Sequence, residues 1–134
     1  MGAWGHRNFE NDEALDFVWE INEGGVQTIR EAINKVVNKP ASEQLESPEC
    51  TEALAAIEYV AAAKGNPSED FPEESEIWLE KNGGKELLSI DDSILLKAIE
   101  RIKSSSELRE QWDESDDAKE WYNILSGLEQ RLHP

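Results

Sequence analysis

Three carboxylates recur at four-residue intervals near the start of the chain: Asp12, Asp16 and Glu20. This spacing places them on one face of a helix, where two of them could bind a hard cation such as Mg²⁺ or Ca²⁺. Such a site needs further oxygen ligands, and the sequence offers no second carboxylate cluster on an apolar helix face. A solvated helix face is the simpler interpretation, so we assign no metal and no cofactor.

Motifs of the common enzyme classes are missing from the sequence. There is no phosphate-binding loop, no dinucleotide-binding glycine pattern, no zinc-protease HExxH and no nucleophile elbow. His6 and His133 lie near opposite ends of the chain, so a dyad with Cys50 depends on the fold bringing one of them to the thiol. A free cysteine more often packs as a small apolar residue. We therefore assign no catalytic residue and favour a non-catalytic protein.

The charge balance restricts the classes of partner. The chain carries 30 acidic and 13 basic side chains, a formal net charge of −17. Such a field repels nucleic acid phosphates and anionic membranes, and it permits binding of a basic protein. The densest acidic runs, SEDFPEESE and DESDD, supply a candidate binding patch: Glu69, Asp70, Glu73, Glu74, Asp113, Asp116 and Asp117.

Length and composition indicate one domain over residues 1–134. The apolar share is 38%, and five tryptophans add bulk to a core. Because Cys50 is the only cysteine, an intrachain disulfide is excluded, which fits a reducing compartment. The opening MGAWGHR lacks the apolar stretch of a signal peptide, and no run approaches the length of a membrane span. We expect a cytoplasmic protein.

Helical periodicity fills the sequence between clusters of glycine, proline and serine. Asn11 is a good N-cap for a helix that ends at NEGG, and a second helix follows over residues 26–38. Ser47 and Pro48 start an alanine-rich helix that ends at Gly65. Later helices are expected over 90–103 and 116–132, with short ones at EIWLEKNGG and ELREQW. The prediction is an all-α compact bundle of five or six helices around the alanine-rich one.

The segments outside these helices have expected positions too. The tail 1–10 packs on the domain, and residues 66–76 form an acidic loop. Trp19, Trp78 and Trp121 lie on periodic apolar faces and are expected in the core, whereas Trp112 is half exposed. Ile77 docks on the core beside Trp78.

The opening stretch GAWGHRNFENDEALDF is interpreted as a structural latch. Trp4 anchors the tail in a slot of its own domain and Phe9 makes an apolar contact. Asn11 caps the first helix, and Asp12 lies where the helix dipole favours negative charge. Asp16 lies beyond the first turn and is expected to pair with Arg7 or with a basic residue of another helix, which would join the tail to the domain.

Three stretches resemble a bacterial family known as domain of unknown function 4259. The opening residues that carry the resemblance are Gly2, Trp4, Phe9, Asn11, Asp12, Ala14 and Asp16. SPECTEALAAIEYVAAAKG is similar to the family's alanine-rich middle helix, and SSSELREQWDES to its segment before the last helix. The resemblance implies a bacterial, cytoplasmic origin and adds no activity.

Three functional hypotheses remain open at this point. The first is an inhibitor or immunity-like interaction protein that covers a basic protein surface through electrostatic attraction. The second is a metal-binding or metal-dependent enzyme that uses Asp12, Asp16 and Glu20. The third is a homo-oligomeric domain whose interface includes the N-terminal tail.

Overall fold

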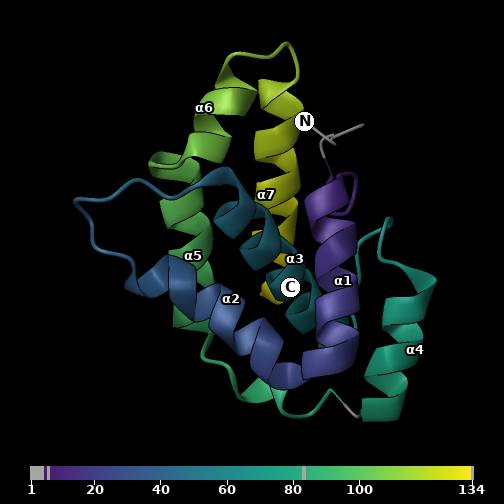
Figure 1. Ribbon diagram of the computed structural model, residues 1–134. Helices are drawn as coiled ribbons and strands as arrows, with labels where there is room; N and C mark the ends of the chain where they lie inside the picture. Colours follow the sequence, from purple (N-terminus) through teal and green to yellow (C-terminus); the bar gives the residue numbers. More distant parts are fainter. Residues whose placement is uncertain (1–4, 6, 83, 134) are drawn as a thin grey trace.

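The computed structural model describes residues 5, 7–82 and 84–133, and these residues form an all-helical bundle (Figure 1). Its seven α-helices are α1 (Asp12–Gly24), α2 (Val26–Asn38), α3 (Ser47–Ala63), α4 (Glu73–Asn82), α5 (Asp92–Ser104), α6 (Glu107–Asp113) and α7 (Ala118–Leu132), with a 3₁₀ turn η1 (Leu87–Ser89) before α5. No strand occurs within these ranges. The all-α prediction is confirmed.

The predicted number of helices, five or six, was too low. Both short segments are full helices, because each has a specific anchor. In α4, Trp78 is buried against Tyr59, with ring centroids 5.8 Å apart. In α6, the Ser106 hydroxyl accepts the Arg109 N–H at 3.0 Å as an N-cap. Because α4 begins at Glu73, the acidic loop is also shorter than the predicted 66–76 and covers residues 66–72.

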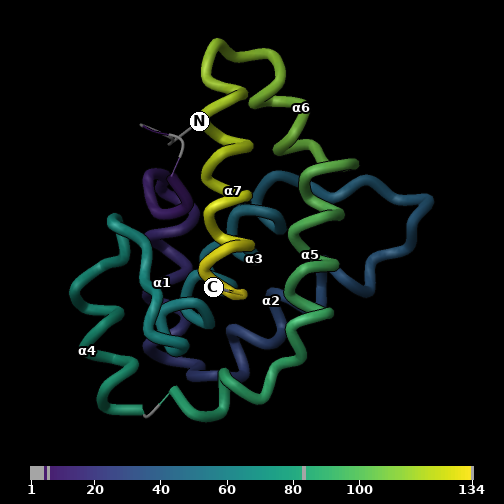
Figure 2. Tube along the Cα trace, turned by 180° about the vertical axis from the view of Figure 1, so that it is seen from behind, coloured from purple at the N-terminus to yellow at the C-terminus, as the bar shows by residue number. Residues whose placement is uncertain are grey.

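Helix α3 is the centre of the bundle, as its alanine-rich sequence predicts. It contacts every other helix of the described chain and the 3₁₀ turn. Its small side chains permit this close approach on all sides, and 11 of its 17 residues are buried. Helices α1 and α2 cover α3 on the side seen in Figure 1. Seen from behind in Figure 2, α7 lies over α3 and beside α5.

The starts of two helices differ in detail from those predicted. Ser47 lies inside α3, and Glu46 is the N-cap, with Glu49 Oε1 accepting the Glu46 N–H at 3.3 Å. Helix α5 begins at Asp92 rather than at the predicted residue 90, and Asp91 caps it by accepting the Ser93 N–H at 3.0 Å. At α3 the Ser47 hydroxyl is engaged in a tertiary contact instead: it donates to Gln111 of α6 at 2.8 Å.

The connection between α2 and α3 is held by Arg101 of α5. Its guanidinium donates to four backbone carbonyl groups around this turn, those of Val36, Lys39, Pro40 and Glu43. The bond to Val36 satisfies one of the last carbonyl groups of α2, which have no partner within the helix, and the other three hold the C-cap and the connection that follows. One arginine therefore fixes the path between the second helix and the central one.

Candidate functional site

The N-terminal segment before α1 is anchored to the acidic loop. Phe9 is buried, and its backbone N–H donates to Asp70 Oδ2 at 3.0 Å. Its ring meets Phe71 edge-on at 5.6 Å and Tyr59 at 6.4 Å. The predicted apolar contact of Phe9 is therefore confirmed, and the loop is its partner. The predicted slot for Trp4 lies outside the described residues.

A buried ion pair between α3 and α7 holds the same segment through Asn8. Glu58 of α3 is 1% exposed, and its carboxylate accepts two hydrogen bonds from Arg131 of α7, at 2.7 and 3.0 Å. Asn8 Nδ2 donates to Glu58 Oε2 at 2.7 Å. Burial opposes the Arg131 charge, but the Glu58 carboxylate outweighs it, so the pKa of Arg131 is raised.

Sequence patterns did not identify this cluster, although they contain a signal for it. Glu58 is the only charged residue from Ala53 to Ala63, and a charge in a helix that is apolar on all sides must have a partner. That signal predicts a buried pair. It does not identify Arg131, which lies 73 residues away in the sequence.

A groove of about 250 Å³ lies where the start of α1, the start of α3 and helices α6 and α7 meet. Trp112 and Trp121 stack along it with ring centroids 6.4 Å apart. Ser47 at the start of α3 donates to Gln111 of α6, which joins two helices distant in sequence. Asn11 Nδ2 donates to the Asn8 carbonyl at 3.3 Å, a local bond that fixes the turn before α1. Both bonds have a structural role.

The motif at the start of α1 divides into buried and exposed residues. Asn11 is the N-cap, and its Oδ1 accepts the Ala14 N–H at 2.8 Å, as predicted. Asp12 and Asp16 are exposed and form no hydrogen bond or ion pair with a described side chain. Arg7, expected to pair with Asp16, donates instead to Glu69 at 3.0 Å. Asp16 is thus not part of the latch that Phe9 and Asn11 form.

The outward face of α1 carries the largest departure from the predicted core. Trp19 is 68% exposed, not buried. The helix buries Ala14, Phe17, Val18 and Ile21, a stripe at helical spacing. At 3.6 residues per turn Trp19 lies roughly opposite this stripe, so the broad apolar arc seen in the sequence included one residue of the solvent face. Ile77 of α4 is likewise 45% exposed, not docked.

The predicted acidic patch lies in two separate places. Residues 69–74 run along the loop into α4, whereas residues 113–117 connect α6 to α7 at the top of the view in Figure 1. In the first group Asp70 bonds to Phe9 and to Ser68. Glu73 and Glu74 are exposed in the first turn of α4, where the helix dipole favours them.

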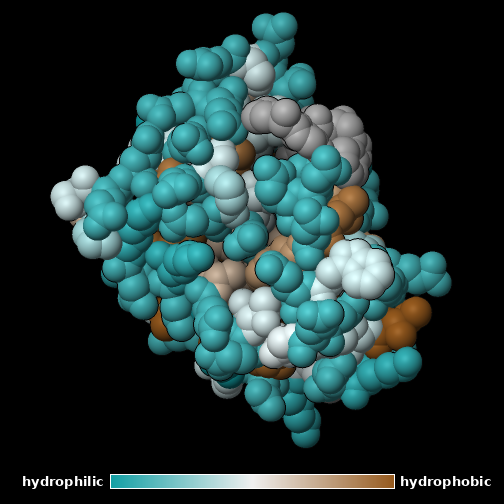
Figure 3. Space-filling view, viewed as in Figure 1, coloured by the Kyte–Doolittle hydropathy of each residue, from teal (hydrophilic) through white to brown (hydrophobic). Residues whose placement is uncertain are grey.

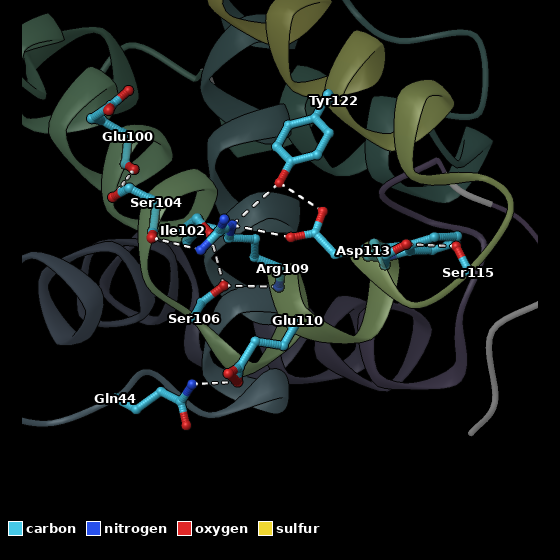
Figure 4. A network of polar contacts seen from close by, with 11 residues as sticks. Gln44, Glu100, Ile102, Ser104, Ser106, Arg109, Glu110, Asp113, Ser115 and Tyr122 are labelled. Carbon is cyan, nitrogen blue, oxygen red and sulfur yellow. Dashed lines mark hydrogen bonds and ion pairs between the residues drawn. The ribbon is translucent and has the colours of Figure 1, made fainter.

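Asp113, in the second group, belongs to an internal network (Figure 4). Its carboxylate accepts the Tyr122 hydroxyl at 2.9 Å and pairs with Arg109 Nε at 3.2 Å. Arg109 also donates to the Ser104 carbonyl at 3.1 Å. Asp116 and Asp117 are exposed beside this network. The connection thus offers three carboxylates without an ion pair, those of Glu114, Asp116 and Asp117, whereas Asp113 joins α6 to α7.

Two other chemical features of the sequence have defined environments. In the part of the chain that the structure describes, no three His, Cys, Asp or Glu side chains are grouped so that they could hold a metal ion. Cys50 is fully buried, and burial raises the pKa of its thiol to about 12. The thiol is therefore protonated at neutral pH, which is the state of a packing residue rather than of a nucleophile.

No described helix is long and apolar enough to cross a bilayer.

These features define a small all-α domain with an acidic surface and a latched N-terminal segment. The chain belongs to the family described as domain of unknown function (DUF4259), which matches residues 2–123. The family resemblance of the sequence is thus confirmed. No curated protein and no solved structure shows significant similarity to the chain. Since the family description carries no activity, function has to be argued from the surface itself.

Proposed function

We propose that this protein is a small, non-catalytic interaction protein, of the inhibitor or immunity-like kind, that covers a basic surface of another protein. One observation carries the proposal. Lysines and arginines, all of them within the described residues, form ion pairs with six of the 30 carboxylates. Most of the negative charge is therefore not neutralised by the chain's own lysines and arginines.

The basic side chains, in contrast, mostly form ion pairs or hydrogen bonds within the fold. Six of the 13 are in these ion pairs, and Arg30 and Arg101 donate to backbone carbonyl groups. A surface with this excess of negative charge attracts a basic partner over long range and accelerates its association. Both effects weaken as salt screens the charges. It also disfavours polyanionic partners such as nucleic acids.

Affinity capture tests the proposal. The tagged protein is incubated with extract of its source cell at low salt, and captured proteins are identified after elution with about 0.5 M NaCl, where the Debye length falls well below 10 Å. We expect a basic protein among those released. The candidate partner is then purified and its binding measured directly by calorimetry. If no partner is enriched at low salt, or if the enriched partner binds equally well at high salt, the proposal is wrong.

A further inference from the structure

Trp19 is the most exposed large apolar side chain of the described residues. It is 68% exposed, against 45% for Ile77 and 50% for Leu88. The face that α1 and α2 present in Figure 3 is otherwise mainly hydrophilic. An exposed tryptophan leaves a large apolar area in water, and tryptophan is enriched among the residues that dominate protein–protein binding energy. Most of this residue therefore lies outside the packing of the domain.

The charges of the residues around Trp19 determine which sign of charge a surface that covers it should carry. Asp16 lies three residues before it and Glu23 four residues after it, so these two carboxylates flank the indole on the helix surface. Glu20, the next residue, lies about 100° further round the helix, toward the groove between α1, α2 and α3. All three carboxylates are exposed and pair with no lysine or arginine of the chain. The α1 face is thus an apolar centre with an acidic rim, the arrangement of an interface core and its polar border.

A groove extends this face toward α3. It has a volume of about 290 Å³ and lies between α1, α2 and α3, with Glu20, Glu31 and Glu52 in its lining and Lys35 as the one cation there. Glu52 is half-buried and forms no ion pair. Burial, and then the charge of Glu20, raise its pKa. A cationic side chain entering the groove would relieve this repulsion.

We propose that the outward face of α1 is the contact surface for a basic protein, with Trp19 inserted into an apolar pocket of the partner that is bordered by lysines or arginines. This inference rests on the proposed function and names the surface that performs it. A lysine or arginine of the partner would reach the carboxylates of the adjoining groove. A second copy of the chain is a poor occupant, since two such faces carry charge of the same sign.

The experiment compares four baits in parallel captures at low salt. They are the wild type, Trp19→Ala, the charge-neutral Asp16→Asn/Glu20→Gln and the control Leu88→Ala, which removes an exposed apolar side chain from η1. Circular dichroism checks that each bait is folded, and folding is expected in all because the substituted side chains are exposed. The basic partner is then purified and its dissociation constant measured for each bait.

We expect Trp19→Ala to weaken binding by roughly 30-fold or more, as for a central interface tryptophan. The double variant should slow association and reduce its salt dependence, and Leu88→Ala should bind as the wild type does. If Trp19→Ala binds the basic partner as tightly as the wild type, the α1 surface is wrong and the proposed function stands. If no bait captures a basic partner, both fail. Sedimentation showing a dimer that Trp19→Ala dissolves would make a second copy the occupant and overturn the inference.

Discussion

Among single residues, Glu58 and Arg131 form the buried ion pair to which Asn8 of the N-terminal segment is bonded. The Glu58 side chain is 1% exposed, whereas the Arg131 side chain is 24% exposed. Because of this difference in exposure, removing one partner should not cost the same stability as removing the other. Without Arg131 the carboxylate stays buried with Asn8 as its remaining side-chain donor. Without the Glu58 charge, Arg131 still reaches water.

We therefore predict that Arg131→Met lowers the free energy of unfolding by roughly 3–5 kcal/mol, the usual cost of leaving one buried charge uncompensated. Glu58→Gln should cost less. The double variant Glu58→Gln/Arg131→Met should recover part of the Arg131→Met loss, because no buried charge remains. Urea unfolding of the three variants measures these values. Equal losses in both single variants, with simple additivity in the double, would contradict this account.

The predictions for single residues are correct where a residue's role depends on its neighbours in the sequence. They fail where burial or a contact depends on how the helices pack in the whole bundle. Asn11 was predicted as a cap because an N-cap depends on its own neighbours. Trp19 was misassigned because a helical wheel of one segment does not reveal how wide the buried stripe is. The partner of Glu58 was not predictable, since it lies on a helix distant in sequence.

At the scale of elements, the start of α1 provides a test of which motif residues hold the structure. We predict that Asn11→Ala lowers the free energy of unfolding by about 1 kcal/mol through loss of its hydrogen bond to the Ala14 N–H. Asp16→Ala on the same helix should change it by less than about 0.5 kcal/mol, as for exposed sites without partners. Chemical denaturation compares them, and a larger loss in Asp16→Ala would show a contact that this account lacks.

The groove between α1, α2 and α3 predicts a pH-dependent effect of Glu52. The pKa of Glu52 is raised in the folded protein, which means that the fold favours the protonated carboxyl over the charged one. At low pH Glu52 is protonated and does not destabilise the fold. As the pH rises through the folded pKa, the carboxyl becomes charged and the fold loses stability. Glu52→Gln should therefore stabilise the fold at pH 7. The gain should shrink as the pH falls toward about 4.3, the ordinary glutamate value.

Thermal unfolding at several pH values measures this effect, with Glu23→Gln on the exposed side of α1 as the matched control. A stabilisation by Glu52→Gln that is equal at pH 4 and pH 7, or equal to that of Glu23→Gln, would contradict the predicted repulsion in the groove.

The elements themselves were largely predictable, and their arrangement was predictable in outline. Helix α2 runs over the predicted 26–38, and α3 is the predicted centre because its alanines permit contacts on all sides. The start of α4 inside the acidic loop was not predictable. Its anchor is the packing of Trp78 and Phe71 on Tyr59, contacts that depend on the assembled bundle.

For the whole molecule, composition gives the net charge, from which a basic partner is proposed, and the structure adds where the charge is left unpaired. Ion pairs with the chain's lysines and arginines involve six of the 30 carboxylates. The sequence runs favoured residues 69–74 and 113–117 as the binding patch, but Asp70 and Asp113 are bonded within the fold. The α1 face was hidden in the sequence because Trp19 seemed part of the core pattern.

The most direct test of the central claim, that this acidic protein covers a basic protein surface, is the dissociation constant of the purified complex as a function of salt. We predict that binding weakens steadily between about 0.05 and 0.5 M NaCl, because screening reduces attraction between oppositely charged surfaces. A dissociation constant that does not change across this range, or a partner with net negative charge, would contradict the claim.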